Sequence, residues 1–158
     1  MAHPTYRRRW TIKSPANPAV GVEWALRAPG SAIWRIVSLA ATLTTSAVVA
    51  NRRVRLIADD QTRTWYAEIA SADQVASTTT VYCAHTGASG AGLTAAVLTL
   101  PLPAAGLLLR PGHFLRSSVV NLDPGDQWAS VAAVIDEVPS DVPYIGDHTV
   151  IATRDVGE

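Results

Sequence analysis

Cysteine is almost absent from this chain, which has one cysteine, Cys83, in 158 residues. A single cysteine excludes an intrachain disulfide and a metal site built from several cysteines. Val81 and Tyr82 precede it and indicate a strand, in which we expect the thiol to be buried as a small hydrophobic group. The fold must therefore be held by packing and hydrogen bonds.

Charged residues are scarce as well, at 16% of the chain against about a quarter in typical globular proteins. The 13 basic and 13 acidic residues balance to a net charge of zero. Nucleic-acid-binding proteins normally have a basic surplus, so we expect no nucleic-acid partner. Lys13 is the only lysine; an excess of arginine follows from GC-rich coding and is also typical of protein interfaces. So little charge favours association with copies of the same chain or with a partner.

Long apolar runs are missing too. The least polar stretch, 36–50, contains threonine and serine and is shorter than the roughly 20 residues that a membrane-spanning helix needs. After Arg7, Arg8 and Arg9 the chain continues Trp-Thr-Ile-Lys, which is not the apolar core of a secretion signal. We therefore expect no membrane partner and a soluble protein that assembles in a cytoplasm.

The chain does contain three pairs of proline followed by glycine, at Pro29-Gly30, Pro111-Gly112 and Pro124-Gly125. Proline fixes φ at the second residue of a turn, and glycine supplies the positive φ that a type II turn needs at the third. These turn-forming pairs separate apolar runs rich in β-branched residues. They predict a compact domain of antiparallel strands.

The apolar runs between these corners read as strands. We expect them at 23–27, 33–45, 51–60, 62–69, 78–83, 94–102, 107–110, 114–122 and 127–135. In the second of them, unbroken alternation places Ile33 and Leu39 on one face and Trp34 on the other. Pro101 and Pro103 confine their strand to a sheet edge, because neither can donate to a ladder. The fold class is all-β, an antiparallel β-sandwich or jelly roll of about eight strands.

The chain divides into an extended N-terminal arm at 1–21, a β-sandwich domain at 22–138 and a C-terminal tail at 139–158. The arm is proline-rich and basic, with a short strand expected at Arg9 to Lys13, and it would become ordered only against another surface. The tail has no sustained pattern.

Two segments interrupt the strands. Ser71 and Gln74 fit a capping box, which predicts a single helical turn at 71–76. Glycines and small residues at 87–92 predict a flexible surface loop.

Residues that often carry catalysis do not form a recognisable set. No Gly-x-Ser-x-Gly elbow occurs, and no Lys-Ser or Lys-Thr follows the glycine-rich stretch 89–92. Asp136 and Glu137 are neighbours in a strand and face opposite ways, so they cannot act as a pair. No histidine has a second ligand at metal-binding spacing; the histidines are His3, His85, His113 and His148. We predict no enzyme activity, no metal and no cofactor.

Other polar residues have structural explanations. Arg52, Arg53 and Arg55 lie at the start of a hairpin and are expected to pair with Asp59, Asp60 or a cross-strand acid.

Asp123 and Asp126 flank a tight turn and should bond its own backbone, whereas a calcium loop would need further acids. At least three of four tryptophans should pack in a core or an interface rather than form a sugar platform; they are Trp24, Trp34, Trp65 and Trp128.

Three stretches carry a family resemblance: 33–55, with its Ala-Thr-Leu-Thr-Thr-Ser and Val-Ala-Asn-Arg-Arg runs, then 107–116, and then 121–128, Asn-Leu-Asp-Pro-Gly-Asp-Gln-Trp. Together they resemble small proteins encoded among the head genes of tailed phages that infect actinobacteria. The resemblance covers about Trp24 to Glu137. It implies a capsid decoration or minor head protein, a homotrimer that binds the major capsid protein on the outer surface of the virion and stabilises the shell. It implies no catalytic residue.

The arm supplies the partner-binding residues that we expect, Arg7, Arg8, Arg9 and Trp10, because arginine and tryptophan often dominate interface energy. An alternative function is a carbohydrate- or receptor-binding module of a head or tail fibre, which exposed aromatics beside an acid would favour. A cupin-like enzyme would share the jelly roll, but the chain lacks the histidine cluster that its metal needs.

Overall fold

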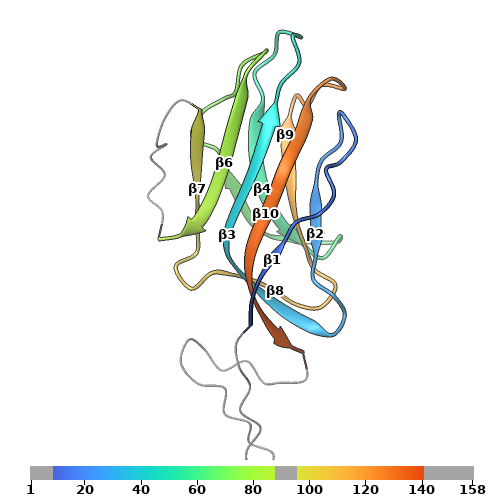
Figure 1. Ribbon diagram of the computed structural model, residues 1–158, viewed down its shortest axis with the longest axis vertical. Helices are drawn as coiled ribbons and strands as arrows, with labels where there is room; N and C mark the ends of the chain where they lie inside the picture. The colour runs from blue at the N-terminus through green and yellow to red at the C-terminus, as the bar shows by residue number, and fades with distance from the viewer. Residues whose placement is uncertain (1–8, 88–95, 141–158) are drawn as a thin grey trace, which may run out of the picture.

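The computed structural model of the chain describes residues 9–87 and 96–140 (Figure 1). Within these ranges it contains ten strands and no helix. The strands are β1 (Arg9–Lys13), β2 (Ala25–Arg27), β3 (Ala32–Thr44), β4 (Arg53–Asp59), β5 (Thr64–Ile69), β6 (Thr79–Thr86), β7 (Val97–Leu102), β8 (Leu107–Leu109), β9 (Phe114–Val120) and β10 (Gln127–Pro139). The all-β prediction is confirmed.

The strands form two sheets that lie one behind the other in Figure 1. The front sheet has the order β1-β10-β3-β6-β7, with β8 also paired to β3, and the back sheet has the order β2-β9-β4-β5. Every pairing is antiparallel except that of β6 with β7, which is parallel. The β-sandwich is thus confirmed, and the jelly-roll connectivity stays a prediction.

Strand β7 lies at an edge of the front sheet, as its prolines predict. There the Tyr66 hydroxyl of β5 donates to the backbone carbonyl of Pro101, at 2.7 Å, and so joins the two sheets along one side. Burial, with a smaller contribution from Glu68, raises the pKa of Tyr66 to about 12, so this hydroxyl keeps its proton.

Aromatic side chains fill the space between the sheets. Trp24, Trp34 and Trp128 are buried, which confirms that at least three tryptophans pack in a core or an interface. Trp128 contacts Trp24 edge-on, with ring centroids 6.3 Å apart, and Tyr82 at 5.9 Å. Such pairs add roughly 0.5–1.5 kcal/mol beyond the area that they bury. Trp65 differs, because 43% of it is exposed.

A β-bulge in β3 overturns one facing prediction. Ile36 pairs with Ile135 and Ser38 with Val134, which leaves Val37 as an extra residue. A bulge shifts the alternation of side chains by one residue. Trp34 therefore lies on the core side together with Leu39, and their predicted placement on opposite faces is wrong.

The Pro111-Gly112 corner has the predicted geometry. Gly112 has φ of 82°, and the N–H of His113 donates to the carbonyl of Arg110 at 3.0 Å, which closes a type II turn.

The type II prediction is wrong at Gly30 and Gly125, neither of which has a positive φ. At the first corner, the Pro29 carbonyl accepts from Ala32 at 3.3 Å, so proline is the first residue of that turn rather than the second. At Gly125 an added Cβ would lie 2.9 Å from the Cβ of Ser46. Space, not φ, requires glycine there.

Part of the predicted arm belongs to the sandwich. The short strand expected at Arg9–Lys13 is β1, which pairs along β10. Beyond it, Asn17 accepts from the N–H of Ser130 at 3.1 Å, and the Pro18 carbonyl accepts from the amide of Gln127 at 3.0 Å. The surface against which these residues are ordered is their own sheet.

The helical turn predicted at 71–76 is wrong. Gln74 instead forms an isolated antiparallel bridge with Arg52, with both backbone hydrogen bonds at 2.9 Å. The predicted loop at 87–92 falls almost wholly on 88–95, and the tail on 141–158, which lie outside the described residues.

Candidate functional site

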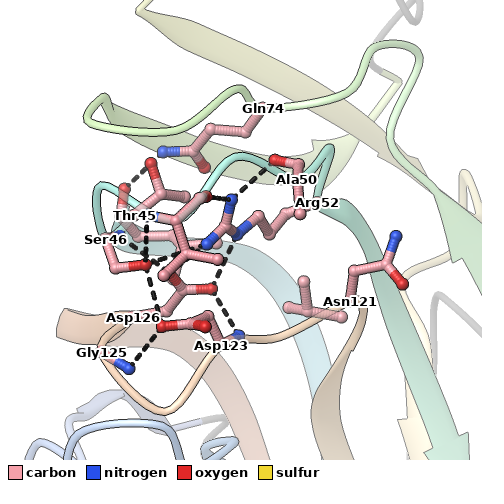
Figure 2. Close-up of polar contacts among 12 residues, drawn as sticks. Thr45, Ser46, Ala50, Arg52, Gln74, Asn121, Asp123, Gly125 and Asp126 are labelled. Atoms are coloured by element: carbon pink, nitrogen blue, oxygen red, sulfur yellow. Dashed lines mark hydrogen bonds and ion pairs between the residues drawn. The ribbon is translucent and has the colours of Figure 1, made fainter.

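A buried ion pair joins the loops at one end of the sandwich (Figure 2). The guanidinium of Arg52, which precedes β4, forms two contacts with the carboxylate of Asp126, which precedes β10: Nε to Oδ2 at 3.0 Å and Nη2 to Oδ1 at 3.1 Å. Both side chains are 0% exposed. Two parallel bonds of this kind are the strongest geometry open to arginine and carboxylate.

Every N–H of this guanidinium has an acceptor. Besides Asp126, it donates to the backbone carbonyls of Val48 at 2.7 Å and Ala50 at 2.6 Å, and to the hydroxyl of Ser46 at 3.0 Å. A buried arginine is tolerated only when its donors are satisfied in this way. Arg52 thereby fixes the β3–β4 loop, whose tip exposes 94% of Val49.

The carboxylate of Asp126 is equally well satisfied. It accepts the N–H of Ser46 at 2.8 Å and the N–H of Asp123 at 2.8 Å. Burial tends to raise the pKa of Asp126, but the hydrogen bonds from Arg52 and the backbone outweigh it and lower that pKa below its usual value. Asp123 in turn accepts the N–H of Gly125 at 2.8 Å. The prediction that both aspartates bond their own turn is confirmed.

Gln74 connects the β5–β6 loop to the same cluster, which we call the loop-end cluster: Thr45, Ser46, Arg52, Gln74, Asp123 and Asp126. Its amide donates to the carbonyls of Leu43 at 2.9 Å and Thr78 at 3.0 Å, and accepts from the hydroxyl of Tyr82 at 3.0 Å. The Thr45 hydroxyl donates to the backbone carbonyl of Val75 at 2.7 Å, so the side chains of the cluster hold the backbone of these loops in place. The cluster is therefore a structural clamp on the loops.

A second group of arginines lies on the outer side of the back sheet, and we call it the arginine face: Arg27, Arg53, Arg55 and Arg116. The strand register sets their positions. Arg27 lies opposite Phe114, Arg116 opposite Ile57 and Arg55 opposite Ser118, so the arginines follow a diagonal across β2, β9 and β4. Diagonal neighbours on one sheet face are about 7–8 Å apart.

The arginine face holds more positive charge than its contacts neutralise. The Nε of Arg116 lies 2.6 Å from a carboxylate oxygen of Asp59. Arg53 bonds Asp73, which raises the pKa of Arg53 and lowers that of Asp73.

Arg55 and Arg27 have neutral partners. Arg55 donates to the Ser118 hydroxyl at 2.8 Å, and the Arg27 guanidinium lies 5.3 Å from the Phe114 ring.

The predicted pairing with an acid is thus correct for Arg52 and Arg53, although neither pairs with Asp59 or Asp60, and it is wrong for Arg55, which bonds Ser118. Arg52 pairs with Asp126 and Arg53 with Asp73, whereas Asp59 pairs with Arg116 from β9. One signal in the sequence points to the buried role. Arg52 has the parity of Val54, Leu56 and Ala58, whose side chains face the core.

Apolar side chains are exposed beside the arginines. Trp65 is 43% exposed, Ile69 51% and Val120 41%. Trp65 and Ile69 share a face as predicted, and this face points outward. The Trp65 ring lies against His113, with ring centroids 4.4 Å apart.

The outer side of the front sheet has a different composition, and we call it the uncharged face. It comprises Ile12, Ser38, Ala40, Thr42, Val81, Cys83, Ala132 and Val134 from β1, β10, β3 and β6. Six of these eight, all but Thr42 and Val81, line a shallow hollow of about 330 Å³ together with the exposed His85. Cys83 is partly exposed there rather than buried.

The remaining predicted residues are dispersed. Arg7, Arg8, His3 and His148 lie outside the described residues, and Arg9 is in β1. Trp10 is 55% exposed on β1, and its role in partner binding stays a prediction.

Asp136 and Glu137 form separate ion pairs. Asp136 lies 3.1 Å from Arg35, and Glu137 lies 3.3 Å from Lys13. This separation agrees with opposite facing.

Residues 9–87 and 96–140 contain no group of three or more histidine, cysteine, aspartate or glutamate residues that could hold a metal ion. The same ranges contain no helix of the length and apolarity needed to cross a membrane. In comparisons with known proteins, the chain matches no family model, no curated protein and no solved structure.

Proposed function

We propose that this chain is a non-catalytic structural protein of a phage particle, which binds the assembled shell and stabilises it. The observation that carries the proposal is the uncharged face. Apart from the ion pair of Arg35 with Asp136, the described residues on this outer side of the front sheet include no lysine, arginine, aspartate or glutamate, although Ile12 is 71% exposed. Soluble monomers rarely leave a large uncharged sheet face in water.

A second copy of the chain is the occupant that this face suits best. Ala40 lies at its centre, between Ala132 of β10 and Cys83 of β6. Small side chains leave a flat surface, on which another sheet can pack closely without burying a charge.

An oligomer built in this way would present several shell-binding sites at once. Linked sites reinforce one another, so contacts that are weak singly give firm attachment to a lattice. A homotrimer that binds the major capsid protein on the outside of the virion is the form that the phage resemblance supports.

The test combines the size of the protein in solution with its location in particles. We expect an oligomer by sedimentation, and Ala40→Arg should give a folded monomer because it places a charge in the centre of the interface. Ala104→Arg is the matched control, since Ala104 is exposed in the β7–β8 loop. A monomeric wild type, or its absence from purified particles, would contradict the proposal.

A glycan-binding module of a fibre is the second candidate, and one observation favours it. The exposed Trp65 ring lies against the His113 ring, with ring centroids 4.4 Å apart. An exposed aromatic ring offers an apolar face on which a sugar can stack. Binding on a glycan array that Trp65→Ala abolishes would favour this candidate over a shell-binding role.

A further inference from the structure

We infer that the arginine face is the surface that docks on the partner, and that the partner is a protein surface carrying carboxylates. This inference rests on the proposed function, because it names which side of the sandwich meets the shell. It assigns the positive, outward-facing side of the back sheet to the partner and leaves the uncharged face for self-association.

Charge complementarity is the first reason. Among the described residues, Arg53 and Arg116 contact carboxylates, whereas Arg27 lies against a ring and Arg55 donates to a hydroxyl. The face therefore has guanidinium groups in excess of carboxylates. A partner that supplies carboxylates would complete this set, and a basic partner would be repelled.

The residue type is the second reason. A guanidinium is planar and presents its donors as a fork that matches the two oxygens of a carboxylate. Arg27 and Arg55 lie on strands of one sheet, so the backbone ladder fixes their separation. A rigid sheet loses little freedom when it binds, which favours a partner surface that is also ordered.

Apolar neighbours distinguish a protein partner from a nucleic acid. Trp65 and Ile69 are about half exposed beside the arginines. Arginine and tryptophan are the residues whose truncation most often weakens protein interfaces. Phosphate binding gains little from an exposed isoleucine, and the chain as a whole has no basic surplus.

The test uses the full chain and shells purified without it. Wild type should cosediment with the shells, and the double variant Arg27→Gln with Arg55→Gln should bind at least about tenfold more weakly. Arg63→Gln is the matched control, because Arg63 is exposed in the β4–β5 turn, and it should bind within about twofold of wild type. Equal binding by the double variant and wild type would overturn the inference.

Two probes separate this inference from the proposed function. Immobilised poly-L-glutamate should retain wild type at low salt and release the double variant, whether or not shells bind. If wild type were retained on this matrix but did not bind shells, the shell-binding function would be contradicted, and the arginine face would still be a carboxylate-binding surface. The inference of a protein partner would be overturned if wild type bound a DNA duplex more tightly than poly-L-glutamate and the double variant did not bind that duplex.

Discussion

Arg52 and Arg55 are three residues apart in one segment, yet they lie in opposite environments. Arg52 is 0% exposed and bonds Asp126 and three further acceptors in the loop-end cluster. Arg55 lies on the arginine face and donates to Ser118. Strand parity makes the difference, because Arg52 points to the core side and Arg55 points outward. The same residue type thus serves folding in one place and, as we propose, binding in the other.

Removing the buried guanidinium should have the largest effect. Arg52→Met leaves Asp126 as a buried charge without its partner, and we expect a loss of about 3–5 kcal/mol in the free energy of unfolding. Urea denaturation followed by tryptophan fluorescence measures this loss. Arg55→Met is the control within the same segment. If the two variants were equally stable, the buried pair would not be the clamp that its geometry indicates.

Acid should lower the free energy of unfolding by a smaller amount than Arg52→Met does. The folded pKa of Asp126 is lowered from 3.8, so its contribution to stability is full above that value and is lost as the pH falls through the folded pKa. Asp126→Asn removes this titration. The difference in unfolding free energy between wild type and Asp126→Asn should therefore be constant from neutral pH down to about pH 4 and shrink below it. A difference that grows on acidification would contradict the lowered pKa.

The contrast between these two arginines also shows what sequence can predict. Alternation in 53–59 correctly predicts which side chains of β4 face the core, because apolar residues at every second position of a strand lie on the same face. The same rule fails for Trp34, since the extra residue Val37 depends on pairing with β10, a strand about a hundred residues away.

The contacts of the loop-end cluster could not be predicted from the sequence for a related reason. Arg52 and Asp126 are 74 positions apart, and no local pattern links them. The sequence therefore suggests Asp59, Asp60 or an unspecified cross-strand acid as the partner, although Asp59 pairs with Arg116 on the neighbouring strand. The bridge between Gln74 and Arg52 likewise keeps the backbone of 71–76 from forming the helical turn that its local sequence favours. Long-range pairing decided each of these cases.

The smallest effect on stability should come from the outward-facing arginine. Arg55→Met removes one hydrogen bond to Ser118 on a partly exposed face, and we expect a change below about 1 kcal/mol in the free energy of unfolding. Thermal unfolding followed by circular dichroism would measure it. A loss as large as that of Arg52→Met would mean that the arginine face is part of the scaffold, and its excess charge would then need no partner to explain it. A small loss, together with weaker binding to shells, would separate the two roles that one arginine-rich segment combines.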